Sequence, residues 1–324
     1  MIFLGMLAGI GLSLNPETWI GDSLPTIGHL SLKNLTIPGT HDSGSYYLTP
    51  TDMPGDAPAF WDAVYTLAND LDKSVGEVAL LWSKTQDLNF YQQMQGGIRY
   101  FDLRAGYNKT TSTWVTFHFL QGSPVIELLQ NISEYMKAYP QEIVIIEISH
   151  FRGSPTEQNI VELRSLVYQV LGPLLCPVDL NFAFSIGQMV STGQRALVTM
   201  ESGSDGKFIW PPGAIYNTYA DTPDLGKMIS FNNETVQRFE KEGCSGCLFK
   251  ISWTLTAGDK EILESVVPWK PHSLIELANH ANKALPSFWN SIKKNQWRMG
   301  NVLIIDHFES SQIMNVVWSN NGLV

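Results

Sequence analysis

The sequence has no apolar run long enough to cross a membrane, no cluster of basic residues and little cysteine. A membrane-spanning helix needs about 20 consecutive apolar residues. The most apolar stretch, MIFLGMLAGIGLSLNP at residues 1–16, is shorter than that. Because no internal repeat or low-complexity linker divides the 324 residues, we expect one large domain.

Basic residues are scarce, with 21 Lys and Arg against 31 Asp and Glu, which gives a net charge of −10. We therefore expect no binding to nucleic acid through a basic surface. The same charge disfavours electrostatic docking on an anionic membrane. A transient contact with a membrane surface would instead use apolar and aromatic side chains.

Cysteine occurs three times, as Cys176, Cys244 and Cys247. A zinc site would need further Cys or His residues at ligand spacing, and none is near. The CSGC sequence at 244–247 lacks the surroundings of a thioredoxin-like redox motif. We interpret the cysteines as structural, and CSGC is able to form a local disulfide in an oxidising compartment.

The apolar N terminus resembles the core of a signal peptide, although it lacks the usual positive charge before it. The alternative interpretation is a buried N-terminal strand or helix. N-glycosylation sequons follow at Asn34, Asn108, Asn131 and Asn233. Together these features favour a secreted or lumenal glycoprotein, and a cytoplasmic protein is the alternative.

Short apolar segments rich in β-branched residues recur along most of the chain, as expected for the buried strands of a parallel sheet. We predict strands at 34–38, 97–106, 113–119, 142–151, 195–201, 214–219, 247–255 and 301–308. The first apolar run is expected to break at Pro38-Gly39.

Amphipathic segments of helical length lie between these strands, at 123–140, 155–172 and 272–295. Strands and helices that alternate about eight times are typical of a (β/α)8 TIM-like barrel. We therefore predict a single α/β barrel domain at 25–324. The segment 52–95 is expected to be a helical insertion before the second strand.

Polar residues follow the predicted strands at their carboxyl ends. Each of these residues has an ordinary explanation by itself, such as a helix cap or a surface ion pair. In a (β/α)8 barrel, however, the strand ends converge on the face that contains the active site. The residues that we expect to meet there are His41, Asp42, Asp102, Arg104, His118, Glu147, Ser149, His150, Asp306 and His307.

This set of side chains suits acid–base chemistry on a phosphate. One histidine can take a proton while the other gives one, and a carboxylate can hold each imidazole in its useful tautomer. A guanidinium can bind two phosphoryl oxygens at once.

Several separate motifs resemble one family. LTIPGTHDSGSY, QQMQGGIRYFDLRAG, FHFLQGSPVIELLQNISEYMKAYPQEIVIIEISHF and GNVLIIDHF occur in the order found in the X-domain of phosphatidylinositol-specific phospholipases C. The resemblance covers roughly residues 30 to 310 and is closest to the animal X-domain-only proteins, with the bacterial enzymes next. It implies a barrel that cleaves phosphodiesters.

The resemblance also implies roles for individual residues. His41 is similar to the general base and His118 to the general acid, and Arg104 corresponds to the phosphate-binding position. Asp306 would orient His41, Asp42 would support the opposite side of the site, and Asp102 falls at the acidic position beside Arg104.

The expected absence of a metal rests mainly on position 104. In the calcium-dependent members of the family an acidic ligand stands where this chain has Arg104, and Ser149 falls near the position of another calcium ligand. Because a hard cation needs several oxygen ligands, we expect no calcium and no other cofactor.

The chain departs from the bacterial members where these contact the inositol ring. Those enzymes have a lysine near Ser149 and an arginine near the end of the fifth strand, and this chain has neither. Lys250, Trp253 and Tyr219 are candidate replacements. Our predicted substrate-binding residues are Asp102, Glu147, Ser149, Lys250 and Trp253.

The predicted function is a metal-independent phosphoric diester hydrolase that cleaves a glycerophospholipid, an inositol phospholipid or a head-group phosphodiester. One alternative is a glycerophosphodiesterase-like or sphingomyelinase-like enzyme. Those enzymes use a Glu-x-Asp pair on the second strand, where this chain reads Asp102-Leu103-Arg104. The other alternative is a non-catalytic phospholipid-binding protein on the same barrel. Its expected sign is loss of His41, His118 or Arg104, and all three are present.

Overall fold

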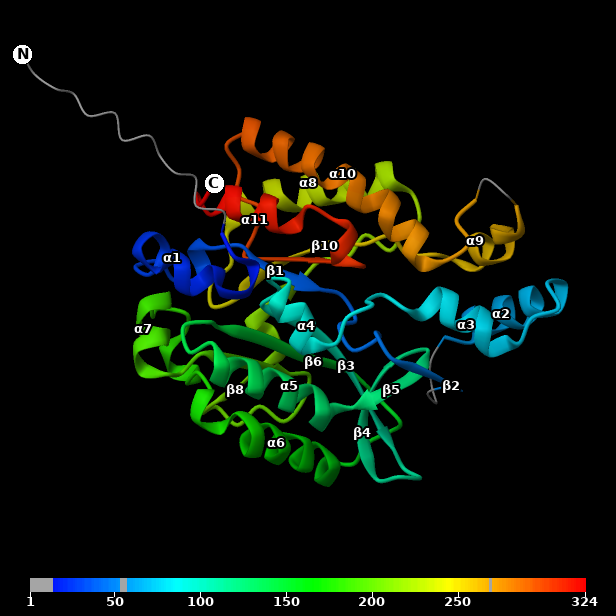
Figure 1. Cartoon of the computed structure of the whole chain (residues 1–324), viewed down its shortest axis with the longest axis horizontal. Helices are drawn as coiled ribbons and strands as arrows, with labels where there is room; N and C mark the ends of the chain where they lie inside the picture. The colour runs from blue at the N-terminus through cyan, green and yellow to red at the C-terminus, as the bar shows by residue number, and fades with distance from the viewer. Residues whose placement is uncertain (1–13, 53–56, 268–269) are drawn as a thin grey trace, which may run out of the picture.

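The computed structural model describes residues 14–52, 57–267 and 270–324 (Figure 1). The predicted signal peptide at 1–16 lies almost entirely outside the described residues. The strands are β1 (Ile37–Thr40), β2 (Leu48–Asp52), β3 (Tyr100–Asn108), β4 (Thr113–His118), β5 (Leu120–Pro124), β6 (Val144–Arg152), β7 (Ala196–Met200), β8 (Ile209–Trp210), β9 (Ile215–Asn217), β10 (Leu248–Trp253) and β11 (Val302–Ile305). The helices are α1 (Trp19–Ile27), α2 (Pro58–Asp70), α3 (Val75–Ser83), α4 (Phe90–Gln95), α5 (Val125–Ala138), α6 (Glu157–Leu171), α7 (Ile186–Thr192), α8 (Leu225–Glu242), α9 (Asp259–Leu263), α10 (Leu274–Lys294) and α11 (Ile313–Asn320).

The parallel strands form one sheet in the order β9–β10–β11–β1–β3–β6–β7–β8. No ladder joins β8 to β9 in the described part of the chain, so hydrogen bonds do not close the barrel there. From β3, the strands β4, β5 and β2 continue the sheet in antiparallel fashion. The antiparallel extension brings the end of β4 beside the parallel strand ends, and it was not predicted from the sequence.

The predicted helices are present with small changes of length. The segment 123–140 contains α5, 155–172 contains α6, and 272–295 contains α10. The predicted helical segment 52–95 contains α2, α3 and α4 in its described part. A capping box between Ser74 and Glu77 begins α3 and fixes where this helix starts.

The first strand differs from the prediction, because β1 runs through Pro38-Gly39 to Thr40 instead of ending there. Proline has no N–H to donate, but the Pro38 carbonyl still accepts a hydrogen bond from the Arg99 amide at 2.9 Å. A Cβ at Gly39 would lie 2.8 Å from the Tyr100 ring, so glycine lets β1 pack closely against its neighbours. The extra length of β1 carries the chain to His41 at the strand end.

The two ends of the strands have different surroundings. Apolar residues near the strand starts, including Ile37, Ile145 and Ile304, form a buried cluster with Trp19 of α1. Figure 1 shows α1 and α7 at this end of the sheet, while α2, α3 and α9 lie together at the opposite end, toward which β1 and β11 point. The polar residues therefore concentrate where the strands finish.

A buried ion pair ties the amino-terminal end of the barrel to α1. Arg99 donates to Glu142 through Nε at 2.8 Å and Nη2 at 2.6 Å, and both side chains are fully buried. The other carboxylate oxygen of Glu142 accepts from the Gly21 amide of α1 at 2.8 Å. This carboxylate therefore joins three parts of the chain.

We expect Glu142→Leu to lower the free energy of unfolding by about 3–5 kcal/mol, because it leaves the Arg99 charge buried without its partner. Urea unfolding measures this loss. Glu240→Gln is the control, because its partner Arg298 is 54% exposed and an exposed pair contributes about 0–1 kcal/mol. Equal losses in the two variants would contradict this view of the Arg99–Glu142 pair.

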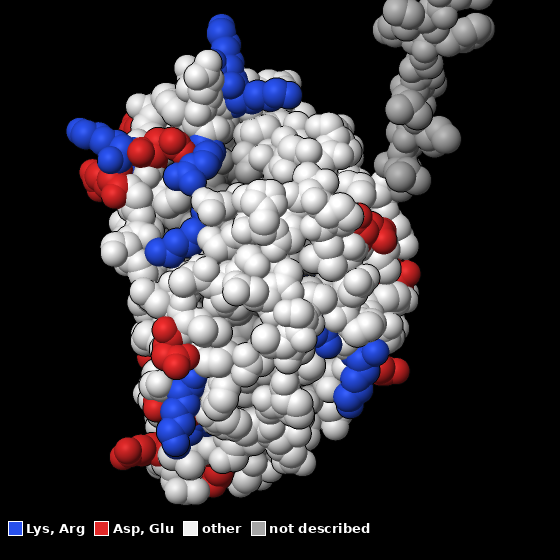
Figure 2. Space-filling model, turned by 90° about the vertical axis from the view of Figure 1, so that its left-hand side faces the viewer, with Lys and Arg blue, Asp and Glu red and all other residues white. Residues whose placement is uncertain are grey.

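Cys244 and Cys247 form a disulfide, which confirms the local pairing considered from the CSGC sequence, and Cys176 is a buried free thiol. None of the described helices has the length and apolar character needed to span a membrane. Figure 2 shows the face at the left of Figure 1, where charged side chains of both signs lie mostly near the edges and form no continuous basic surface.

Candidate active site

His41 follows β1 directly, and Asp306 follows the neighbouring strand β11. His41 Nδ1 lies 2.8 Å from Asp306 Oδ1. Asp306 is buried, and its backbone carbonyl accepts a hydrogen bond from Asn282 of α10. Because the ionised carboxylate can only accept, it places a proton on His41 Nδ1 and leaves Nε2 for proton transfer.

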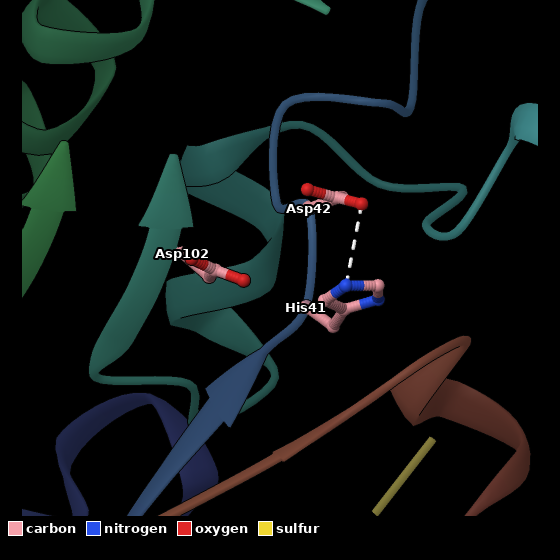
Figure 3. Close-up of side chains that lie close together, drawn as sticks. All are labelled: His41, Asp42 and Asp102. Atoms are coloured by element: carbon pink, nitrogen blue, oxygen red, sulfur yellow. Dashed lines mark ion pairs between the residues drawn. The ribbon is translucent and has the colours of Figure 1, made fainter. Parts of the chain in front are cut away.

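Asp42 occupies the centre of the site. Its Oδ2 atom lies 3.3 Å from His41 Nε2 and also 3.3 Å from His118 Nε2, while its Oδ1 atom pairs with the Arg104 guanidinium. Figure 3 shows Asp42 beside the His41 ring, with Asp102 on the adjacent strand β3. The backbone of Asp42 is left-handed (φ 40°), a conformation that Asp tolerates better than most residues.

The charges around Asp42 keep it ionised. Burial raises the pKa of this carboxyl, but Arg104, His41 and His118 outweigh burial and lower its pKa to about 2. The Arg104 side chain is 22% exposed and lines the pocket described below. Asp42 is therefore a fixed negative charge that holds two imidazoles and a guanidinium near one point.

His118 ends β4 and faces His41, with ring centroids 6.2 Å apart. Its Nδ1 atom lies 2.6 Å from the carbonyl oxygen of Ser83. A carbonyl oxygen only accepts, so His118 has its proton on Nδ1 when it is neutral, and Nε2 points to the centre of the site. Both histidines thus present Nε2 for proton transfer.

The surroundings shift the pKa values of the two histidines in opposite directions. Burial disfavours the charge on His41, but Asp42 and Asp306 outweigh burial and raise its pKa to about 9. Burial, with Arg104 and His41, lowers the pKa of His118 although Asp42 opposes this. At neutral pH and without substrate, His41 is therefore protonated and His118 is neutral.

The segment 83–87 contacts both histidines, a role that was not predicted from the sequence. Ser83 supplies the carbonyl that orients His118. Thr85 Oγ1 lies 2.9 Å from the His41 carbonyl, and Gln86 Nε2 donates to the same carbonyl at 3.1 Å and to that of Ile305 at 2.9 Å. These hydrogen bonds fix the backbone of His41 and of Ile305, the residue before Asp306.

His307 holds the same segment from the other side. Its Nδ1 atom lies 3.0 Å from Asp87 Oδ2, its Nε2 atom lies 2.9 Å from the Lys84 carbonyl, and its amide donates to Thr85. His307 follows β11 directly after Asp306, at the predicted strand end, but its side chain contacts the segment 83–87 and does not line the pocket.

We expect Gln86→Leu to lower kcat about tenfold or more with little change in KM, because a small displacement of His41 misaligns the proton transfer. Steady-state kinetics measure this effect. Gln158→Leu, an exposed position on α6, is the control and should retain wild-type kcat. A normal kcat in Gln86→Leu, with the fold intact by circular dichroism, would show that the segment does not position the site.

A second group of charges lies deeper in the barrel. Lys250 of β10 is buried and contacts Glu147 at 2.5 Å and Asp102 at 3.8 Å. Tyr100 donates a hydrogen bond to Glu147. Burial disfavours the charge of Lys250, but Asp102 and Glu147 outweigh burial and raise its pKa. Three of the predicted substrate-binding residues thus form one network, in which Asp102 and Lys250 are buried and Glu147 is partly buried.

The other predicted substrate-binding residues lie apart. Ser149 lines a separate small pocket together with Glu147, His150 and Glu201. Trp253 is fully buried, and its Nε1 donates to the Ala281 carbonyl of α10 at 3.0 Å. This placement gives Trp253 a packing role and offers no support for its predicted contact with substrate. Tyr219, considered as an alternative, lines the same pocket as the histidines.

One group in the described residues has the composition of a metal site. Ligand atoms of His41, Asp42 and Asp102 lie within 4.8 Å of one another. Cations of the protein already face both carboxylates, because Arg104 pairs with Asp42 and Lys250 lies 3.8 Å from Asp102. A divalent cation prefers several free oxygen ligands, so this group fits a metal poorly.

A pocket with a cavity volume of about 250 Å³ opens over the histidines. His41, Arg104, His118 and Asp306 line its polar side. The remaining lining is mainly apolar and comes from α2, α3, α9, the start of α10, the segment 255–257 and the aromatic residues Phe119 and Tyr219. Asp259 of α9 adds one acidic side chain to this lining. The site can therefore hold a small anionic group beside an apolar one.

The chain is similar to known proteins over most of its length. PI-PLC X domain-containing protein 2 of Homo sapiens is 28% identical over 279 residues, which are 84% of this chain and 85% of the relative. PI-PLC X domain-containing protein 3 of Danio rerio is 26% identical over 313 residues, which are 94% and 92% of the two chains. No family model matches the chain.

Solved structures give the same result for the fold. The phosphatidylinositol-specific phospholipase C from Listeria monocytogenes aligns with a TM-score of 0.66 at 20% identity, over 95% of this chain and 99% of that one. The enzyme from S. aureus aligns with a TM-score of 0.63 at 18% identity, over 95% and 97%. These alignments confirm the predicted TIM-like barrel of the phospholipase C type, and the relatives confirm the resemblance of this chain to the phosphatidylinositol-specific phospholipase C X-domain family.

Proposed function

We propose that this chain is a phosphoric diester hydrolase of the phospholipase C type that works by histidine acid–base catalysis without a metal. The observation that supports the proposal most strongly is the convergence of His41 Nε2 and His118 Nε2, each 3.3 Å from the same oxygen of Asp42, with Arg104 on the other oxygen. The substrate class that we propose, a phospholipid, comes from the similar proteins, which include PI-PLC X domain-containing protein 2 and a phosphatidylinositol-specific phospholipase C.

In the proposed reaction, His41 accepts the proton of the attacking oxygen, which bonds to phosphorus. The bond between phosphorus and the leaving oxygen then breaks, and His118 gives that oxygen a proton. Arg104 binds the phosphoryl oxygens and offsets the charge that develops on them. Asp42 and Asp306 stabilise the imidazolium forms that arise in turn.

The surface near the pocket supports a transient contact with lipid. Tyr219 is 41% exposed at the pocket, and Leu263 and Val266, just beyond the pocket residue Ile262, are 39% and 49% exposed. Exposed apolar and aromatic side chains of a protein insert into the interfacial region of a membrane, and this insertion does not need basic residues on the protein. A secreted or lumenal location is proposed from the sequence alone.

The proposal is tested by incubating the purified chain, with EDTA present, with a panel of phospholipids and soluble head-group diesters, and identifying products by phosphorus NMR. A phospholipase C reaction leaves the phosphate on the head group and releases the apolar alcohol. Release of phosphate still bound to the apolar alcohol, or no turnover of any diester, would contradict the proposal.

We expect the pH profile of kcat/KM to be bell-shaped, because the reaction needs one proton shared between two histidines. Activity should rise as pH passes the lowered pKa of His118, which lies below 6.5, and should fall as pH passes about 9, where His41 loses its proton. The profile is the same whichever histidine is the base, since both assignments need one proton on the pair.

The matched variant for this profile is Asp42→Asn. Removing this carboxylate removes one cause of the high pKa of His41, so the alkaline limb should move to lower pH. An alkaline limb that stays in place would show that His41 does not set it.

A further inference from the structure

The small pocket at the ends of β6 and β7 takes no part in the proposed acid–base chemistry. Its cavity volume is about 220 Å³. Its polar lining consists of two carboxylates, one imidazole and two hydroxyls, which belong to Glu147, Glu201, His150, Ser149 and Thr199. No Lys or Arg is among the lining residues in the described part of the chain. A ligand in this pocket therefore meets negative charge and hydrogen-bond acceptors.

The sheet register places this pocket in line with Arg104. Arg104 pairs with Ser149 of β6, and the Glu201 amide, just after β7, donates to the Ile148 carbonyl at 2.9 Å. Arg104, Ser149 and Glu201 therefore occupy corresponding positions on three successive strands. Because neighbouring strands are about 4.8 Å apart, the backbones of Arg104 and Glu201 are about 10 Å apart. The residue between them is a serine, whose side chain is small.

Two hydroxyls of this pocket have no hydrogen-bond partner among the described residues. Thr199 is 1% exposed and its Oγ1 atom is buried without a partner, as is the Oγ atom of Ser149. Thr199 pairs with Glu147 in the sheet register, so its side chain lies on the same face of the sheet as that carboxylate. A buried hydroxyl without a hydrogen bond costs free energy, and native proteins rarely leave one. A ligand with several N–H or O–H donors would satisfy both hydroxyls.

The charges of the pocket favour a cation. Glu147 already pairs with Lys250, whereas Glu201 accepts a hydrogen bond from a neutral group, the Phe151 amide, at 2.7 Å. Burial is the main cause that lowers the pKa of His150, so this imidazole is neutral at neutral pH and adds no positive charge. The negative charge of Glu201 is therefore not neutralised by any lining residue that the structure describes.

We propose that this pocket binds an ammonium group on the head group, so that the preferred substrate is a phosphodiester of an amino alcohol. The inference rests on the proposed function, in which Arg104 binds the phosphoryl oxygens. An amino alcohol of a few carbons then extends from the phosphate along the row to Glu201. An ammonium group has three N–H donors and no acceptor, and Glu201, Ser149 and Thr199 offer it one charge and three accepting groups.

The test compares three diesters that share the leaving alcohol of the best substrate in the panel, all in one neutral detergent at pH 7. Their head groups are 3-amino-2-hydroxypropyl, 2,3-dihydroxypropyl and 2-carboxy-2-hydroxyethyl, which are positive, neutral and negative. Each keeps a hydroxyl at the same carbon, so the same attacking groups are available to all three. We expect kcat/KM for the amine to exceed that for the neutral ester by about tenfold, as for a hydrogen bond to a charged group, and the anionic ester to be the slowest.

Two variants assign this preference to the pocket. Glu201→Gln removes the charge with little change of shape and should bring the ratio of kcat/KM for amine and neutral ester close to one. Thr199→Val removes a hydroxyl that has no partner in the described protein, so it should lower the ratio without lowering the midpoint of urea unfolding. A purely structural role of Thr199 would lower the midpoint instead. Glu134→Gln, at an exposed position of α5 away from the pocket lining, is the control and should keep the wild-type ratio.

The outcomes separate the two proposals. Equal kcat/KM for the amine and neutral esters, or a faster anionic ester, would overturn the ammonium site and leave the proposed function standing. A preference for the amine that persists unchanged in Glu201→Gln would also overturn the site. Failure of the panel and of these three esters to react would overturn the proposed function and, with it, this inference.

Discussion

Arg104→Lys is expected to lower kcat/KM by about a hundredfold to a thousandfold, although it keeps the positive charge. Arg104 pairs with Asp42 at the point where both histidine Nε2 atoms converge. A guanidinium binds two phosphate oxygens in a fixed planar geometry that an ammonium group cannot reproduce. Loss of one such charge donor from a transition state costs about 3 kcal/mol or more.

Steady-state hydrolysis of the best diester from the panel measures this effect. Arg164→Lys on α6 is the matched control, because Arg164 donates to the Gly203 carbonyl away from the pocket lining and should tolerate the exchange. Activity of Arg104→Lys within a few fold of the wild type would show that the guanidinium geometry is not used on the phosphate.

His41→Ala and His118→Ala should each lower turnover by about a hundredfold or more, as expected for loss of a general acid or base. The two roles differ in their dependence on the leaving group. A leaving group of low pKa departs without a proton, so it should partly restore His118→Ala and should not restore His41→Ala.

This comparison also resolves which histidine is the base. The free site holds its proton on His41, whereas the proposed reaction needs a neutral His41 and a charged His118 at the moment of attack. If the good leaving group restores His41→Ala instead, the roles are exchanged. Equal restoration of both variants would contradict separate acid and base roles.

The strand-end positions of the main site residues were predictable, because side-chain direction in a strand has a period of two and a barrel brings its strand ends together. His41, Asp42, Arg104, His118 and Asp306 do meet around one point. The carboxylate at the centre, Asp42, was predicted as a support, and only the structure shows that both imidazoles approach the same oxygen.

Other contributions could not be predicted from the residue pattern. Ser83 acts through a backbone carbonyl, which every residue has, so no motif marks it. Gln86 acts on carbonyls of His41 and Ile305, which lie far from it in the sequence. Lys250 and Trp253 lie on the same apolar strand, and its residue pattern does not distinguish them. Only the contact of Trp253 with α10 and the pairing of Lys250 with Glu147 show that both side chains are buried.

The continuation of β1 through Pro38-Gly39 was also not predictable from the residue pattern. Proline and glycine usually interrupt a strand in the sequence pattern. Here the close approach of Tyr100 requires a residue without Cβ at position 39, and the carbonyl of Pro38 still joins the ladder to β3. Tertiary contacts therefore override the local preference at this point.

Turnover of the best diester with EDTA present, followed by addition of calcium, tests the central claim most directly. The claim is that Arg104, and not a metal, offsets the charge on the phosphate beside His41 and His118. We predict that the wild type is as active in EDTA as without it, that calcium adds nothing, and that turnover by His41→Ala stays about a hundredfold or more below the wild type under both conditions. Loss of activity in EDTA that calcium restores would contradict the claim, and Asp42 and Asp102 would then be metal ligands.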